Sequence, residues 1–129
     1  PNGCGQHHMG AIGFEGASTK QNMLQVPSYE MWIGGGNTPK GLRIGKRVGK
    51  VAAKRVPQAV ERVLSAFSSQ RQESETFYDW LDRTGIEALK ELIADLREVG
   101  PLHKDLDAYK DWGADGVYTV IRGEGECAA

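Results

Sequence analysis

The spacing of apolar residues changes at Pro57, and this change constrains the fold more than any other feature of the chain. Pro57 fits the first position of a helix. After it, apolar residues recur at the helical spacing i, i+3, i+4, i+7, at Val60, Val63, Leu64 and Phe67. The first fifty residues are instead rich in glycine and short apolar runs, which is typical of strands joined by turns. The sequence therefore predicts an α/β (α+β) fold, a small sheet from the first fifty residues covered by C-terminal helices.

Three short strands are expected before the change. Apolar and aromatic residues predict strands at 9–14 and 29–33, and the polar stretch 15–27 between them reads as turn-like. A glycine-rich loop at 34–37 ends the second strand. The third strand is expected over 42–48, where apolar residues alternate with arginines and leave one basic face.

Three helices are expected after the change, at residues 57–71, 75–83 and 85–98. Thr84 and Glu87 have the spacing of a capping box at the start of the last helix. A Gly-Pro pair ends that helix. Its apolar stripe is expected to face the sheet, and the core is expected to include Leu89, Leu92, Trp32 and Trp80.

The chain has 129 residues, about the size of one domain. We expect the domain to occupy residues 1–100 and a C-terminal extension to occupy 101–129. That extension has little periodicity apart from residues 117–121, a candidate edge strand.

The two cysteines, Cys4 and Cys127, lie near opposite ends of the chain and make no disulfide framework. A reducing cytoplasm is therefore the expected location. No apolar run approaches the roughly 20 residues that a membrane-spanning helix needs, so no membrane partner is expected. For Cys127 the alternatives are an exposed, unassigned thiol and a redox or disulfide role.

Charge is unevenly distributed along the chain. Residues 40–55 hold seven basic residues and no acidic one, whereas residues 73–126 hold fourteen acidic and six basic residues. The basic segment, residues 40–55, is thus expected to face something anionic or to be a solvated face. Nucleic acid is not expected as a partner, because stacking aromatics are not interleaved with the basic residues.

The opening residues Pro1-Asn2-Gly3-Cys4-Gly5-Gln6 carry the most specific chemical signal. Glycines beside a cysteine let the backbone approach a bulky inorganic centre closely. Taken alone, a cysteine next to glycine is also compatible with an inert, buried thiol.

Together with residues 11–16, this opening resembles the second cysteine motif of the siroheme nitrite/sulfite reductases. That motif runs threonine-glycine-cysteine-proline-asparagine-(glycine or serine)-cysteine-glycine. Residues 32–35 and 43–47 resemble a strand ending in leucine-glycine-glycine and the basic segment after it. The resemblance covers roughly residues 1–99 and implies the fold of the family's 4Fe-4S domain.

The resemblance implies that Cys4 is the last of four cysteine ligands of a 4Fe-4S cluster and also ligates the siroheme iron. It implies cofactor-binding roles for Asn2, Gly3, Gly35, Arg43 and Arg47, with the arginines clamping siroheme carboxylates. No residue of this chain is assigned a catalytic role. The implied reaction is the six-electron reduction of sulfite to sulfide or nitrite to ammonia, with ferredoxin or a flavoprotein as electron donor. The sequence does not decide between sulfite and nitrite.

The chain also departs from the family's pattern. The other cysteine of the motif would precede Pro1, and the earlier cysteine pair is absent. One thiolate cannot hold a cluster that needs four, so the chain is expected to be a fragment that is free of cluster and inactive alone. The alternative function is an independent module that docks an acidic partner through the basic segment. His7 and His8 are interpreted as ordinary local residues.

Overall fold

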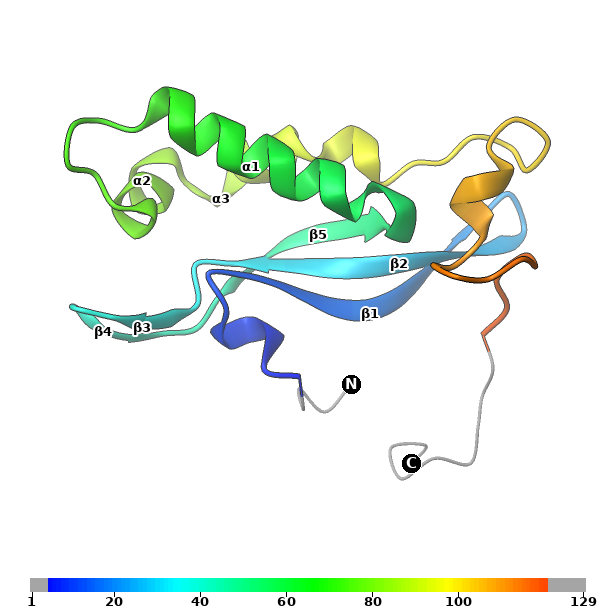
Figure 1. Cartoon of the computed structure of the whole chain (residues 1–129), viewed down its shortest axis with the longest axis horizontal. Helices are drawn as coiled ribbons and strands as arrows, with labels where there is room; N and C mark the ends of the chain where they lie inside the picture. Colours follow the sequence, from blue (N-terminus) through cyan, green and yellow to red (C-terminus); the bar gives the residue numbers. More distant parts are fainter. Residues whose placement is uncertain (1–4, 121–129) are drawn as a thin grey trace.

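The computed structural model describes residues 5–120, which form a sheet with helices on one of its faces (Figure 1). The antiparallel sheet has the order β1-β2-β5, with β1 at Ile12–Gln21, β2 at Leu24–Ile33 and β5 at Lys46–Ala52. The helices are α1 (Val56–Gln70), α2 (Phe77–Thr84) and α3 (Ile86–Leu92). The predicted mixed α/β class is confirmed.

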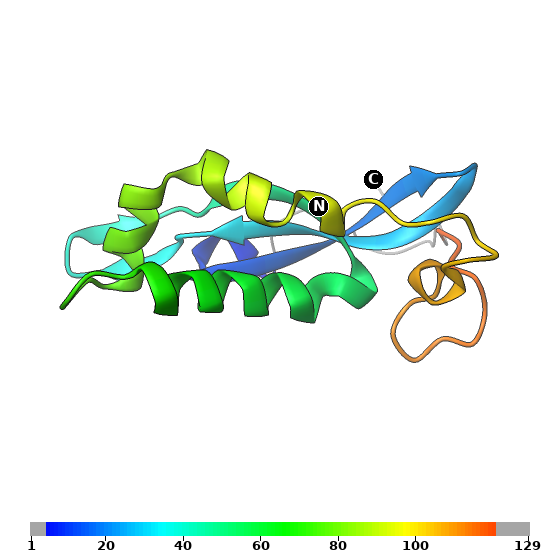
Figure 2. The ribbon, with the colours of Figure 1, turned by 90° about the horizontal axis from the view of Figure 1, so that it is seen from above.

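The helices lie in two rows over that one face. Seen from above, α1 runs along one long edge of the sheet, and α2 and α3 run along the opposite edge (Figure 2). The other face of the sheet carries a short 3-10 turn, η1 (His7–Met9), just before β1 (Figure 1). None of the helices within residues 5–120 combines the length and the apolar character that a membrane span requires.

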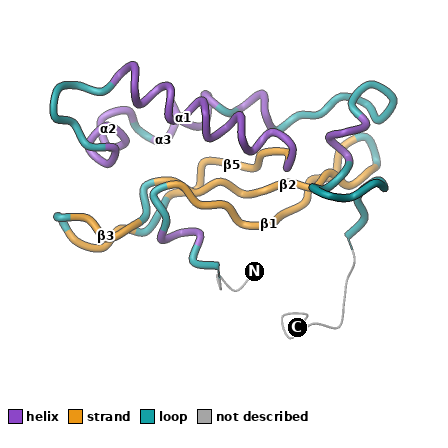
Figure 3. Tube along the Cα trace, in the orientation of Figure 1, coloured by secondary structure: helices purple, strands orange, loops and turns teal. Residues whose placement is uncertain are grey.

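A long hairpin formed by β1 and β2 dominates the sheet (Figure 3). It pairs ten residues on each strand, from Ile12 opposite Ile33 to Gln21 opposite Leu24. The prediction that residues 15–27 are turn-like was therefore wrong. These residues are polar because much of β1 is half-exposed at the sheet edge, where no apolar alternation is needed.

The turn itself is only two residues long. Asn22 and Met23 join the strands with φ of 49° and 66°, and two positive values in sequence are what a type I′ hairpin turn requires. Pro27 pairs with Ser18 and lies just outside the stretch of β2 that pairs with β5. A proline is tolerated there because β2 has only one neighbouring strand at that point.

The predicted third strand, 42–48, is divided between two sheets. Its first part belongs to a two-stranded arm made by β3 (Gly36–Thr38) and β4 (Gly41–Arg43), whereas β5 begins at Lys46. Leu42 and Ile44 are exposed, and only Val48 enters the core. The chain leaves the sheet here and returns, so apolar alternation across 42–48 does not mark a single buried face.

The core lies between the sheet and the helices. Its largest fully buried side chains include Trp80 from α2 and Met31 from β2, and Leu89 of α3 is 2% exposed. Trp80 and Leu89 thus confirm the expected core, while Leu92 and Trp32 are half-buried. On α1 the buried positions are Ala59 and Val63, whereas Leu64, which belongs to the same apolar spacing, is 50% exposed.

The ends of the last two helices differ from the prediction. Thr84 ends α2 instead of capping α3, and Gly85 follows it at φ 81° with its N–H donating to Leu81 O. The cap with the expected chemistry lies eight residues earlier, where Thr76 Oγ1 accepts from the Asp79 N–H at 3.2 Å. The last helix ends at Leu92 and continues only as the 3-10 turn η3 (Ala94–Leu96), short of the predicted residue 98.

Residues 101–120 pack against the turn end of the hairpin. Tyr109, in the 3-10 turn η4 (Leu106–Tyr109), is fully buried and accepts a hydrogen bond from the Asn22 side chain at 2.9 Å. Residues 117–120 are not a strand, so the predicted edge strand is wrong over the part that is described. The division of the chain at residue 100 stays a prediction.

Candidate functional site

Four of the predicted site features lie outside the described residues: Asn2, Gly3, Cys4 and the second cysteine, Cys127. The candidate site within residues 5–120 consists of the segment that directly follows Cys4, residues 5–11, and of the strand ends that hold it.

The backbone of this segment is bonded to the ends of β2 and β5. The N–H groups of three glycines donate to its carbonyl oxygens at 2.7 to 3.0 Å: Gly45 to His8, Gly34 to Ala11 and Gly35 to Gly10. Strand ends far apart in sequence therefore meet around η1. We call these glycines, together with Gly13 of β1, the glycine cradle.

Close approach is the reason for glycine at two of these positions. A Cβ atom on Gly13 would lie 1.8 Å from His7 O, and one on Gly35 would lie 2.2 Å from His8 O. Neither distance is compatible with any side chain, so the cradle can hold the segment only with glycine at both places. Gly35 thus contacts the chain's own backbone, and its predicted cofactor contact stays a prediction.

Four side chains cluster where η1 meets the sheet. His7 Nε2 lies 3.2 Å from Glu15 Oε2 of β1, and the His7 ring lies 5.3 Å from the ring of Trp32. The guanidinium of Arg47 stacks over Trp32 at 5.1 Å. Trp32 Nε1 is buried and, among residues 5–120, has no hydrogen-bond partner. Sequence reasoning assigned His7 no role because this arrangement depends on strand pairing.

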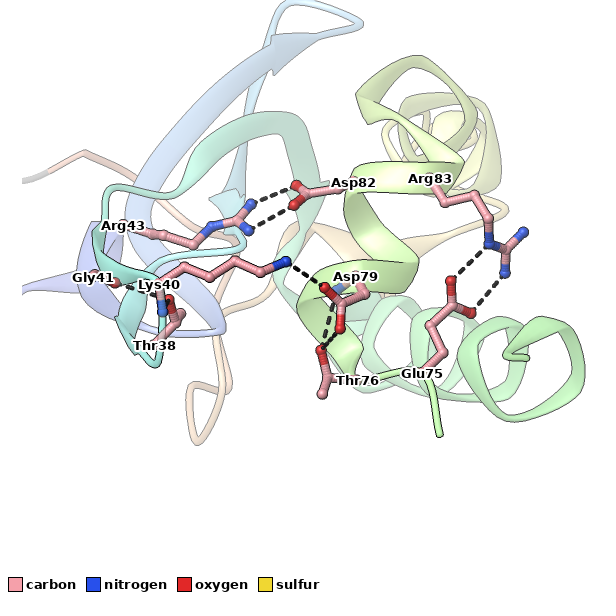
Figure 4. A network of polar contacts seen from close by, with 9 residues as sticks. All are labelled: Thr38, Lys40, Gly41, Arg43, Glu75, Thr76, Asp79, Asp82 and Arg83. Atoms are coloured by element: carbon pink, nitrogen blue, oxygen red, sulfur yellow. Dashed lines mark hydrogen bonds and ion pairs between the residues drawn. The ribbon is translucent and has the colours of Figure 1, made fainter. Parts of the chain in front are cut away.

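Arg43 of β4 binds a carboxylate of its own chain. Its guanidinium donates to both oxygens of Asp82 on α2, at 2.9 and 2.7 Å (Figure 4). The same guanidinium lies 5.3 Å from the centre of the Tyr78 ring. Hydrogen bonding to Arg43 holds the pKa of Asp82 below its ordinary value. A bidentate arginine–carboxylate pair is the geometry predicted for Arg43, but here the partner is a protein group.

Other residues of the basic segment are paired in the same way. Lys40 Nζ lies 2.9 Å from Asp79 Oδ1 (Figure 4), and Arg55 lies 3.0 Å from Asp105. Hydrogen bonds from Thr76 and then from Lys40 lower the pKa of Asp79 to about 2. The segment does face anionic groups, and they include carboxylates of the acidic second half of the chain. Arg47 instead combines an exposed position with its stacking on Trp32.

The described residues alone do not form a metal site. Within residues 5–120, no three histidine, cysteine, aspartate or glutamate side chains gather in a group able to hold a metal ion.

Comparison with known proteins gives a consistent family. The family model described as the nitrite and sulphite reductase 4Fe-4S domain matches residues 1–99. A sulfite reductase (ferredoxin) of Synechococcus elongatus is 28% identical over 92 residues, which make up 70% of this chain and 13% of that protein. An assimilatory ferredoxin-dependent nitrite reductase of Haloferax mediterranei is 27% identical over 105 residues, which make up 81% of this chain and 17% of that protein. The chain thus spans less than a fifth of the length of either relative.

Proposed function

Because the chain belongs to the family of nitrite and sulphite reductase 4Fe-4S domains, we propose that it is part of a siroheme-dependent reductase. The proposed reaction is the six-electron reduction of sulfite to sulfide or of nitrite to ammonia. The observation that carries this proposal is the glycine cradle beside the cysteine motif. It holds the residues directly after Cys4 so closely to the sheet that no side chain fits at Gly13 or Gly35.

In this proposal Cys4 is the metal ligand of the chain, and Asn2 and Gly3 lie with it against the cofactor. The residues present fit such a group, because a thiolate is the ligand that iron–sulfur clusters require, and the cradle keeps the backbone after it compact. When bound, the cluster would store electrons and the siroheme iron would bind the substrate. The protein would contribute position and electrostatics.

The arginines have separate roles in the proposal. Arg47 is exposed beside η1, so its guanidinium is available to a siroheme carboxylate while its stacking on Trp32 fixes its direction. Asp82 already takes one hydrogen bond from each terminal nitrogen of Arg43, so a siroheme carboxylate would have to share this guanidinium with Asp82 or displace it. Arg47 is therefore the stronger of the two candidates.

The proposed electron donor is ferredoxin or a flavoprotein, and the names of both relatives include ferredoxin. A reducing cytoplasm suits a protein whose thiolate must stay free to ligate iron. The alternative function, an independent module that docks an acidic partner through residues 40–55, is not favoured. Several cations of that segment, including Lys40, Arg43 and Arg55, already pair with carboxylates of the chain itself.

The chain by itself is proposed to be inactive. A cubane cluster needs four thiolates, and the sequence has two cysteines, of which only Cys4 lies in a cluster motif. When the isolated chain is incubated with iron and sulfide, the measured iron and sulfide content should therefore correspond to less than one 4Fe-4S cluster per chain.

The test of the central assignment is Cys4→Ser in the full-length reductase, with Cys127→Ser as the matched control. Serine is a harder and more basic ligand than a thiolate, so Cys4→Ser should reduce both iron–sulfide content and siroheme absorption. Turnover should collapse with them, and Cys127→Ser should behave like the wild type. Normal spectra and turnover in the Cys4 variant would overturn the proposal.

A further inference from the structure

A hollow opens between the β3–β4 arm and the helices α2 and α3. It is lined by three buried aliphatic side chains, Ile33, Leu81 and Leu89, and by the backbone of Gly34 and Gly85. A Cβ atom on Gly85 would meet no atom within 4 Å, so the space beside this glycine is empty. The hollow measures about 90 Å³. Since an apolar cavity of about 150 Å³ holds benzene, this hollow has room for one aliphatic side chain.

Two large aliphatic side chains are exposed beside the hollow. Ile44, which lines it, is 58% exposed, and Leu42, two residues earlier on β4, is 67% exposed. A two-stranded hairpin is only marginally stable unless it packs against other elements. Ion pairs of Lys40 and Arg43 hold the arm to α2, at 2.9 and 2.7 Å, but they leave Leu42 and Ile44 without apolar cover. An exposed apolar pair of this kind next to a hollow is typical of an interaction surface.

The charges around the hollow select the kind of group that would cover it. Arg43, Lys46 and Asp82 all line the hollow, so two cations lie there with one carboxylate. Asp82 binds Arg43 through both of its oxygens. Lys46 is exposed and forms no ion pair with any other residue in the range 5–120. A carboxylate on the covering segment would therefore complement the charge of Lys46.

Most of a reductase of the proposed kind lies outside this chain. The chain corresponds to 13% of the length of one relative and 17% of the length of the other. Such a protein has many further segments that could pack on the arm. Interfaces between domains of one polypeptide typically bury about 600–1,500 Å² and mix apolar with polar groups. An aliphatic hollow bordered by charged side chains has this mixed character.

We propose that the hollow and the arm form an interdomain docking surface for another segment of the same reductase polypeptide. That segment places one aliphatic side chain in the hollow, against Ile44, and a neighbouring carboxylate beside Lys46. This inference rests on the proposed function, because it requires the chain to be part of a longer reductase. The arm is then held more firmly in the full-length protein than in the chain of 129 residues.

Two substitutions remove the two parts of this surface separately. Ile44→Ser removes the aliphatic contact, and Lys46→Glu reverses the charge that the carboxylate would meet. Leu106→Ser and Lys20→Glu are the matched controls, because Leu106 is 48% exposed in η4 and Lys20 is an exposed residue of β1. Neither control residue lines the hollow. All four side chains are largely exposed, so none of these changes should unfold the 129-residue chain.

The readout is hydrogen exchange of the amides of β3 and β4, measured in the 129-residue chain and in the full-length reductase. Amides of the β1–β2 hairpin serve as the reference for global folding in both. Arm amides should exchange about tenfold or more slowly in the full-length protein, because docking suppresses local opening of the arm. Ile44→Ser and Lys46→Glu should each shrink this difference, and the two controls should preserve it. Equal exchange of the arm in both wild-type proteins overturns the inference, as does a difference that survives either substitution at the hollow.

Other occupants of the hollow would give different results. If the arm of the 129-residue chain becomes protected as its concentration rises, a second copy occupies the hollow and the inference is overturned. If the arm of the full-length protein becomes protected only after ferredoxin is added, a separate protein occupies it, which also overturns the inference. Wild-type full-length protein without siroheme absorption, iron or sulfide overturns the proposed function instead. Because the exchange measurement involves no cofactor, the two failures are distinguishable.

Discussion

Substituting the same residue type at a buried and an exposed helical position tests the core most directly. Leu89 on α3 is 2% exposed and packs in the cluster between the sheet and the helices, whereas Leu64 on α1 is 50% exposed. Both are leucines within helices, so changing each to alanine alters helix propensity by the same small amount. The difference between the two variants therefore isolates burial.

The magnitude follows from the contacts that are lost. Leu89→Ala removes three buried carbon atoms, worth about 2–2.5 kcal/mol of transfer free energy at about 0.8 kcal/mol each. The cavity left behind raises the expected loss to about 3–4 kcal/mol. For Leu64→Ala only about half of the transfer term applies and no cavity forms, so the expected loss is about 1 kcal/mol. For a domain of this size, Leu89→Ala should lower Tm by roughly 10–15 °C.

The assay is urea unfolding of both variants and of the wild type, followed by far-ultraviolet circular dichroism and by tryptophan fluorescence. Fully buried Trp80 reports on the same core. The slope of free energy against urea should stay constant, so that the midpoint carries the difference. Equal losses in the two variants, or a larger loss for Leu64→Ala, would refute the packing described here.

Three further predictions concern the hairpin turn at Met23, the ion pair of Glu75 with Arg83, and the glycine cradle. Met23→Gly should raise unfolding stability by about 0.5–1 kcal/mol in urea titrations, because Met23 has φ 66° and is 83% exposed; a lower urea midpoint would contradict the turn geometry. Hydrogen bonding to Arg83 lowers the pKa of Glu75 to about 2 from an ordinary value of 4.5, so its stabilisation is complete above pH 4.5 and declines as pH falls toward 2. Urea midpoints at pH 6 and pH 3 should therefore differ less for Glu75→Gln than for the wild type, and an unchanged difference would count against the pair. Gly13→Ala should speed amide exchange in η1 while the exposed control Gly16→Ala does not, because only at Gly13 would a Cβ meet backbone.

The sequence by itself determined the features that depend on neighbouring residues. The helical spacing after Pro57 was enough to predict α1, which the structure places at Val56–Gln70. The predicted α/β class followed from the same change of spacing and is confirmed. The cysteine motif also identified the family, because the motif is a run of neighbouring residues that can be read directly from the sequence.

Other features were misassigned because local patterns support more than one arrangement. Leu64 and Val63 both fit a helical stripe, and only the docking of α1 on the sheet decided that Val63 is buried and Leu64 exposed. A polar edge strand has no alternation that distinguishes it from a turn, so residues 15–21 were predicted incorrectly. The spacing of Thr84 predicted that it caps the start of α3. Thr84 is instead the last residue of α2, because that helix ends only at Gly85, which supplies the positive φ of a helix C-terminus.

Only the tertiary structure decided which side chains meet across long stretches of chain. Arg43 and Asp82 are 39 residues apart in sequence, and His7 meets Trp32 because β1 and β2 pair in one register. Such contacts form when the sheet closes and the helices pack on it, since the free energy that selects them is summed over many distant residues. The sequence gives the chemical type of each side chain, but the packing of the whole domain decides which other side chain it contacts.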